Sequence, residues 1–300
     1  MISHRILAAG PAPVDLGSAA HFTILATSTI TSPDGGIING DVGLYPVGSQ
    51  GISTNQINGT VYNGDANGIA QQAQADLNTA IIAASPAQLS GGINKGADLG
   101  GQTLFTGVYW SSSSLEITGN LTLDGQGDPN AVWIFQMGST LTTAAGGASA
   151  PPASQVILIN GAQARNVFWQ VGSSATLGTY SIFKGTIMAA GAITMNTGST
   201  LDGRALAHGA AVTYDGADGS LSTPAAPMFA GIARTATNAT VILNTSPYFF
   251  VTLQSSPSLS PANWTLMATN NPATNIWTFT DTNATPAVTQ RFYRAFITTP

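Results

Sequence analysis

The chain has 300 residues and a formal net charge of −5 at pH 7, from 8 Lys and Arg against 13 Asp and Glu. Charged residues make up 7% of it, where ordinary soluble domains have about 25%, so the few scattered cations exclude a nucleic-acid-binding protein and uncharged side chains must form most of the surface. The absence of Cys excludes disulfides and thiolate chemistry, the apolar fraction of 43% excludes a disordered chain, and no apolar run is long enough for a membrane span.

The first segment has only Ile6–Ala9 as an apolar run, shorter than the apolar core of a secretory signal, so no signal peptide is expected in this sequence. From about Val14, short alternating apolar stretches separated by Gly predict β-strands. One segment differs. Asp65–Ala84 is rich in Ala and Gln, and its spacing predicts an amphipathic helix with Asp65 as N-cap and Pro86 beyond its end. Its expected apolar face consists of Ile69, Ala73, Leu77, Ala80, Ile81 and Ala84.

Internal repetition follows the helix. Ala175–Leu177, Ile193–Met195 and Val212–Tyr214 have the same pattern, with their central Thr residues 18 and 19 positions apart. Looser copies occur at Leu115–Ile117 and Leu141–Thr143, and Ile30 and Thr31 near the N-terminus fit the same register. A repeat of this length with three short strands is one coil of a β-solenoid, which buries its apolar side only against the next coil.

The alignment of the repeats predicts which positions face the core. The inward set is Phe135, Met137, Trp169, Val171, Ile187, Ala189 and Leu206. The neighbouring outward set is Ile134, Gln136, Phe168, Gln170, Thr186, Met188, Ala205 and Ala207. Because this outward set is largely apolar, we expect the helix to cover it.

A second outward surface, on the following strand of each coil, is made of small and nearly uncharged side chains. Its central column is Thr31, Glu116, Thr142, Thr176, Thr194 and Thr213. The positions two residues earlier are Thr29, Ser114, Thr140, Ser174, Ala192 and Ala211, and those two residues later are Thr118, Ala144, Gly178, Asn196 and Asp215. Coils repeat at about 4.7–4.9 Å and outward side chains along a strand at about 6.6–6.8 Å, so the Thr side chains form a rigid lattice. Such a lattice can hold water in an ice-like arrangement, although Thr is also simply favoured on strands.

Six motifs resemble the microbial ice-binding protein family, also labelled DUF3494-type, over roughly 14–223. They are GDVG (Gly40–Gly43), AQADLNTAI (Ala73–Ile81), LGGQTLFTGVY (Leu99–Tyr109), LTLDGQGDPNAVWIFQMGSTLTT (Leu121–Thr143), INGAQARNVFWQVGSSATLGT (Ile159–Thr179) and NTGSTLDGRALA (Asn196–Ala207). The resemblance implies a mainly β fold, a right-handed three-faced β-solenoid with one long α-helix alongside. It also implies that the N-terminal coil stacks beside the C-terminal coils, with Thr31 next to Thr213.

The activity implied by the resemblance is adsorption to ice, with thermal hysteresis and inhibition of ice recrystallisation, through the face that the helix leaves open. The candidate ice-binding residues are Thr29, Thr31, Thr140, Thr142, Ser174, Thr176, Thr194, Asn196 and Thr213. Glu116 departs from the Thr column and Asp215 lies beside it, so we interpret both as edges of the binding area. The expected partner is the ice crystal surface with its ordered water.

Two other classes of function compete with ice binding. A polysaccharide-degrading solenoid needs paired carboxylates, but Asp124 and Asp202 align as turn positions, so we expect no catalytic residue. The three His residues, His4, His21 and His208, have no ligand spacing, so we expect no metal and no cofactor. A carbohydrate-binding or adhesive surface would need exposed aromatic rings, for which Trp110 and Trp133 are the candidates unless they are core residues.

The last part of the chain is a different module. Pro and Ala break the pattern at Leu221–Met228, which predicts a linker at 224–228. Within 229–300, five alternating stretches separated by Pro, Asn and Ser predict a small antiparallel β-sandwich. We interpret it either as a module that attaches to a cell surface or another protein, or as a spacer. The low charge and the many Thr, Ser and Asn residues favour an extracellular protein, secreted or attached to the cell surface. The last segment resembles C-terminal β-modules of secreted bacterial proteins, and we expect a monomer.

Overall fold

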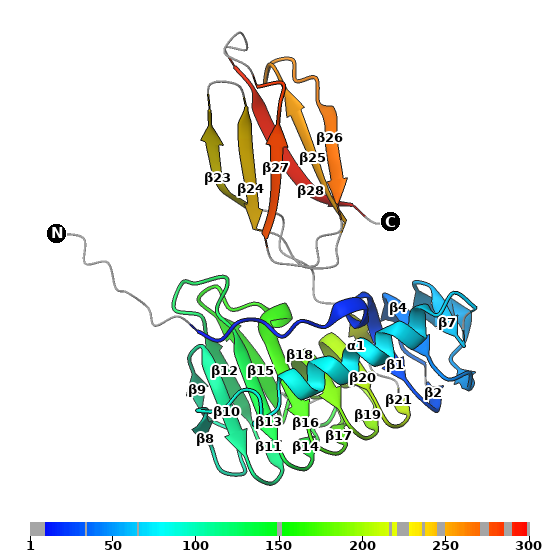
Figure 1. Cartoon of the computed structure of the whole chain (residues 1–300). Coiled ribbons are helices and arrows are strands. Elements are labelled where there is room, and N and C mark those ends of the chain that lie inside the picture. The colour runs from blue at the N-terminus through cyan, green and yellow to red at the C-terminus, as the bar shows by residue number, and fades with distance from the viewer. Residues whose placement is uncertain are drawn as a thin grey trace, which may run out of the picture. The chain divides into compact units, whose positions relative to one another are not determined.

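The computed structural model describes residues 10–33, 35–64, 66–148, 152–215, 218–220, 228–235, 238–244, 250–270, 276–284 and 290–298. They belong to two compact units, Met1–Ser222 and Thr223–Pro300 (Figure 1). The first unit is a mainly β solenoid with one α-helix among its described residues, and the second is built of antiparallel strands.

The solenoid consists of parallel strands in three rows. The first row is β7 (Val61–Asn63), β4 (Asp41–Leu44), β1 (Phe22–Ala26), β20 (Thr200–Ala207), β18 (Ile182–Ala189), β16 (Val167–Val171), β13 (Trp133–Met137), β10 (Gly107–Ser111) and β8 (Ile93–Asn94). The second is β6 (Ile57–Asn58), β3 (Ile38–Asn39), β22 (Asp218–Ser220), the first halves of β20 and β18, β15 (Gln155–Ile159), β12 (Asn120–Asp124) and β9 (Thr103–Leu104). The third is β11 (Leu115–Ile117), β14 (Leu141–Thr143), β17 (Ala175–Leu177), β19 (Ile193–Met195), β21 (Val212–Tyr214), β2 (Thr29–Thr31) and β5 (Ser49–Gly51).

Strands β18 and β20 belong to both of the first two rows. The bend between their halves falls at Gly185 and Gly203, whose φ angles are +108° and +150°. A Cβ atom at Gly203 would collide with the carbonyl oxygen of Gly185. Glycine is therefore required at this corner both for its backbone angle and for the close approach of successive coils.

The coils are not stacked in chain order. Strand β1 pairs with β20 on one side and with β4 on the other, and β2 pairs with β21. The N-terminal coils therefore continue the stack beyond the C-terminal ones, which confirms the order that the family resemblance implied. The handedness of the spiral stays a prediction.

Stacked aromatic rings form the centre of the solenoid core. The Phe135 and Trp169 rings lie 4.0 Å apart and nearly parallel, with Tyr109 5.6 Å from Phe135 and Phe183 4.9 Å from Trp169. The inward prediction is confirmed for Phe135, Trp169 and Ile187, which all belong to the buried core. Each ring packs against a ring of the neighbouring coil, because a solenoid coil buries its apolar side only against the next coil.

The inward prediction was wrong for Leu206. Ile187 pairs with Ala205, so Ala205 and Ala207 face the core and Leu206 faces outward. The last repeat is one residue longer than the preceding one, and the extra residue lies in the turn after Ala207 rather than before the strand. A turn can absorb an insertion, whereas a one-residue slip in a strand moves every side chain to the other face.

Helix α1 (Ile69–Ala83) packs against β1, β7 and β18 and against the short 3-10 helix η1 (Gly17–His21) (Figure 1). Its predicted extent was too long at the N-terminus, because the N-cap is Gly68; Asp65 lies outside the described residues. Its buried side is Ala70, Ala73, Gln74, Leu77 and Ala80. Ile69, expected on that side, is 38% exposed.

Polar contacts tie α1 to the solenoid. Gln136 Nε2 donates hydrogen bonds to the carbonyl oxygens of Ala84 and Leu89, each at 2.9 Å, and Gln74 Nε2 donates to the Ala207 oxygen at 3.2 Å. The Gln136 contacts lie on the outward set that the sequence predicted to need cover. Within the described ranges, neither α1 nor the 3-10 helices, which include η2 (Thr54–Gln56) and η3 (Ala164–Asn166), could span a membrane.

The second unit is a sandwich of two three-stranded antiparallel sheets. Its strands are β23 (Met228–Arg234), β24 (Ala239–Asn244), β25 (Phe250–Ser256), β26 (Thr265–Asn270), β27 (Ile276–Asp281) and β28 (Phe292–Thr298). One sheet has the order β23-β24-β27 and the other β26-β25-β28, around a core of Val241, Leu243, Val251 and Leu253. The sequence predicted five of these strands and missed β23, whose bulge between Phe229 and Gly231 breaks the period of two. Met228, assigned to the linker, is the first residue of β23, and 221–227 lie outside the described residues.

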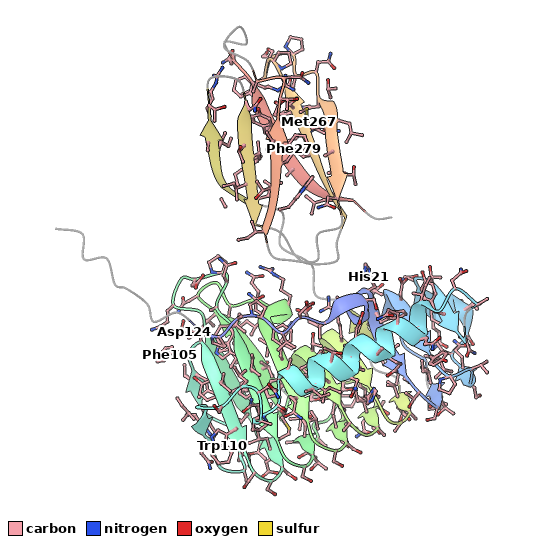
Figure 2. All side chains as sticks on the ribbon, in the orientation of Figure 1. His21, Phe105, Trp110, Asp124, Met267 and Phe279 are labelled. Atoms are coloured by element: carbon pink, nitrogen blue, oxygen red, sulfur yellow. The ribbon has the colours of Figure 1, made fainter. Side chains whose placement is uncertain are left out.

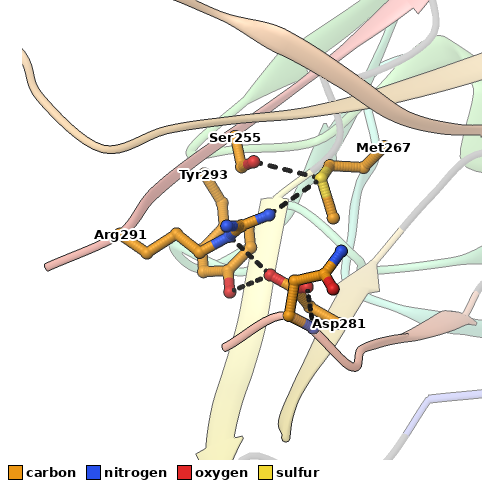
Figure 3. A network of polar contacts seen from close by, with 6 residues as sticks. Ser255, Met267, Asp281, Arg291 and Tyr293 are labelled. Atoms are coloured by element: carbon orange, nitrogen blue, oxygen red, sulfur yellow. Dashed lines mark hydrogen bonds and ion pairs between the residues drawn. The ribbon is translucent and has the colours of Figure 1, made fainter. Parts of the chain in front are cut away.

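A polar network joins the two sheets of the sandwich (Figure 3). The buried Asp281 carboxylate lies 2.6 Å from Arg291 Nε and accepts a hydrogen bond of 2.8 Å from the Tyr293 hydroxyl. Burial, together with the hydrogen bond to Asp281, raises the pKa of Tyr293 to about 12. Because Asp281 ends β27 and Tyr293 is on β28, the network fixes one sheet to the other.

Candidate functional site

The third row of strands carries the candidate site. We call the outward side of β11, β14, β17, β19, β21, β2 and β5 the threonine face. The α1 helix contacts strands of the first row, and in Figure 1 the third row follows the opposite, lower edge of the coils. Side chains point outward here because their neighbours along each strand, such as Ile193 and Met195, are buried in the core.

Parallel pairing brings five predicted Thr residues into one register. Thr142 pairs with Thr176, Thr176 with Thr194, Thr194 with Thr213, and Thr213 with Thr31. We call these five residues the threonine column. Each is half-buried between its neighbours, and the Thr31 hydroxyl is 3.4 Å from that of Thr213. The column thus combines a fixed side-chain direction with regular spacing.

The other predicted residues flank this column. Thr29 pairs with Ser49, and Thr140 and Ser174 directly precede the paired residues Leu141 and Ala175. The Thr140 hydroxyl lies 2.8 Å from that of Ser114. On the other side, Asn196 follows β19, and its backbone N–H donates to the Leu177 carbonyl at 3.0 Å.

One strand of the face was missed by the sequence analysis. Strand β5 contributes Ser49, beside Thr29, and Gly51, beside Thr31. The signal that could have found it is the spacing of 20 residues between these pairs, which fits the repeat. It was hidden because β5 has Gly at the outward position and Gln50 at the inward one.

Among the described residues of the face, the charged ones lie at its margins. Glu116 pairs with Thr142 at one end of the column, and Asp215 follows Tyr214 beyond β21. Asp98 lies beside Glu116 in a further isolated bridge, with its carboxylate held by the Thr118 hydroxyl. Burial opposes ionisation of Asp98, but hydrogen bonds from Thr118 and from backbone N–H groups outweigh it and lower its pKa. The second row differs, since Lys184 and Asp202 form an ion pair of 3.3 Å there.

The carboxylates considered for catalysis have structural contacts. Asp124 Oδ1 accepts hydrogen bonds from Gln126 N at 2.8 Å and Asn160 Nδ2 at 2.9 Å, as expected of a turn residue. The turn assignment was wrong for Asp202, which lies inside β20 because the paired strand extends past it. Among the described residues, no three His, Asp or Glu side chains gather where they could hold a metal ion.

The two Trp residues considered for carbohydrate binding do not form an exposed platform. Trp133 is fully buried, and its Nε1 donates to the Leu104 carbonyl at 3.2 Å. Trp110 is half-buried, at the end of the solenoid where β8 lies, and donates to the Gly92 carbonyl at 3.0 Å (Figure 2). Both therefore belong to the packing of the first row, as the alternative interpretation held.

Comparison with known proteins identifies the family. A family model described as Ice-binding-like matches residues 24–218, which span nearly all of the solenoid. The chain belongs to the Ice-binding-like family. The match leaves out the C-terminal sandwich.

Three relatives of this family member match between 67% and 73% of the chain. A protein of Nostoc sp. (strain HG1) named ice-binding protein is 45% identical over 202 residues, which are 67% of this chain and 71% of that protein. The crystal structure of an ice-binding protein from an Antarctic biological consortium matches with 40% identity and a TM-score of 0.64, over 73% of this chain and 96% of that one. An ice-binding protein from the Antarctic ascomycete Antarctomyces psychrotrophicus matches with 38% identity and a TM-score of 0.61, over 71% and 100%.

Proposed function

We propose that this protein adsorbs to ice through the threonine face and thereby inhibits ice growth and recrystallisation. The names of its relatives support ice as the ligand. The single observation that carries the choice of face is the register of the threonine column across five neighbouring strands.

The chemistry of Thr suits this role. Its hydroxyl donates and accepts hydrogen bonds, so it can take the place of a water molecule in an ordered layer. Its methyl group is apolar, so the neighbouring water molecules order around it without forming hydrogen bonds to it. The Thr side chains already have fixed directions before binding, so they lose little side-chain entropy when the face adsorbs to ice. This preorganisation favours adsorption.

The low charge of the face supports the same proposal. A charged side chain binds its own water strongly, and the removal or reorientation of that water costs free energy. The threonine column contains no charged residue between Thr142 and Thr31.

The experiment is a substitution of Thr176→Tyr or Thr194→Tyr in the full chain. A ring in the middle of the column holds the face away from a flat crystal plane, so thermal hysteresis is expected to fall sharply. The matched control is Thr122→Tyr on β12, an outward Thr of the second row. Far-UV circular dichroism and the melting temperature of all three variants are expected to remain near wild type. Loss of hysteresis in the control alone would move the ice-binding site to the second row.

We also propose that the protein acts outside the cell, and that the C-terminal sandwich serves as a tether for the solenoid. The tether proposal rests on the separate core of the sandwich and on its position outside the family match. A pull-down with the sandwich fused to a fluorescent protein, using the cell envelope as bait, tests it. Absence of any envelope binding would leave the sandwich as a spacer.

A further inference from the structure

The threonine column ends at both sides on a residue that is not Thr. Glu116 of β11 pairs with Thr142 at one end, and Gly51 of β5 pairs with Thr31 at the other. We infer that these two residues set the length of the ice-adsorbing column, and that the fold accommodates Thr at both positions. This inference rests on the proposed function, since it concerns the extent of the same surface.

Glu116 occupies a fully formed position of the lattice. It is the only Glu of the chain, and its side chain is exposed between the buried neighbours Leu115 and Ile117. Its backbone is held on the outer side as well, because Glu116 N donates to the Ala97 oxygen at 2.7 Å and its own oxygen accepts from Leu99 N at 2.9 Å. A Thr here would therefore be held as firmly as those inside the column.

The Glu116 side chain is poorly suited to ice. An ionised carboxylate only accepts hydrogen bonds, whereas a water molecule in ice both donates and accepts. Its long, flexible stem adds rotamer entropy that adsorption would have to remove. The neighbouring carboxylate does not obstruct this position, since Asp98 is bound to Thr118.

Gly51, at the β5 end of the threonine column, has no side chain that could contact ice. Its φ angle is not in the left-handed region, so an L side chain is compatible with the backbone. A Cβ atom built there would lie 3.6 Å from Thr31 Cγ2 and 3.6 Å from the Ile30 oxygen, which is ordinary van der Waals contact. Residue 51 is also exposed, so the rest of a Thr side chain would extend into solvent beside Thr31.

Substitution of both residues would lengthen the column from five aligned Thr to seven. Each substitution adds one Thr to a column of five, so each is expected to raise thermal hysteresis above the wild-type value. Neither substitution touches the core, because Glu116 and Gly51 are both exposed. Glu116 lies between the buried Leu115 and Ile117, and Gly51 lies between the half-buried Gln50 and the buried Ile52. The expected effect is therefore on activity and not on folding.

The experiment measures thermal hysteresis of Glu116→Thr, Gly51→Thr and the double variant in the full chain, at equal molar concentration. Two off-face controls match the changes. Gly147→Thr adds a Thr at an exposed loop glycine whose Cβ would meet nothing within 4 Å. Asp128→Asn removes one negative charge, while its side-chain oxygen can still accept the hydrogen bond from Asn130 N.

The inference predicts that each single variant exceeds wild type, that the double variant exceeds both, and that the controls do not differ from wild type. Equal hysteresis in wild type and all three face variants overturns it, provided that Thr176→Tyr abolishes activity. If Thr176→Tyr retains full activity, the proposed function fails and the inference fails with it. Circular dichroism shows whether each variant folds. If one of the three face variants does not fold, a single variant that does fold tests the inference by itself.

Discussion

Two outward faces of the same coils differ in exposure: the threonine face is open to solvent, and the outward side of the first row is covered. The threonine face presents Thr194 and its equivalents to solvent, whereas the first row presents Phe168, Met188 and Leu206, which are large and lie under cover. Both faces have the same strand spacing and the same alternation with core residues. The difference shows that the backbone supplies the lattice, and that side-chain size and polarity decide whether a face is covered by a helix or left open to a ligand.

Substitution in the covered face is expected to give the largest effect on stability. Leu77 of α1 is fully buried against the solenoid, so Leu77→Ala should lower the free energy of unfolding by about 2–5 kcal/mol. Chemical denaturation measures this loss. Hysteresis per mole of folded protein is expected to remain at the wild-type level. Loss of hysteresis in a variant that circular dichroism shows to be folded would contradict the division between the faces.

The open face should respond in the opposite way. Thr194→Val keeps the shape of the side chain and removes its hydroxyl, so the free energy of unfolding is expected to change by less than about 0.5 kcal/mol. Thermal hysteresis should fall, because one anchoring hydrogen bond in the middle of the column is lost. Unchanged hysteresis would mean that the methyl lattice alone binds ice.

A smaller effect concerns the pH dependence of stability. Burial lowers the pKa of His21 on η1, and the nearby Arg204 lowers it further while Asp41 opposes the shift (Figure 2). The folded state therefore disfavours the protonated ring, so this stability is present above the ordinary pKa of about 6.5 and is lost as the pH falls below it. Urea denaturation between pH 8 and pH 5 should show this loss in wild type, and His21→Gln should reduce the slope.

Removal of the sandwich is expected to have the smallest effect on ice adsorption. Deletion of 226–300 removes only residues of the second unit, so the threonine face and the solenoid core keep all of their residues. Hysteresis per mole should equal that of the full chain. If adsorption disappears while circular dichroism shows a folded solenoid, the sandwich takes part in ice binding.

Sequence reasoning succeeded where one physical constraint acts alone. The repeat predicted the register of Thr142, Thr176, Thr194 and Thr213, because strand alternation and coil stacking leave each residue only one possible side. It failed at Leu206, where a longer turn shifts the numbering, and at β23, where a bulge breaks the alternation. The extension of the face to Gly51 needed the structure, since a glycine has no side chain to reveal a pattern.

Ice-affinity partitioning tests the central claim most directly. Wild type and Thr194→Tyr, labelled with different dyes, are mixed at equal concentration while an ice hemisphere grows slowly in the solution. The account predicts that wild type concentrates in the ice and that the Tyr variant remains in the liquid. Equal amounts of the two proteins in the ice would contradict it.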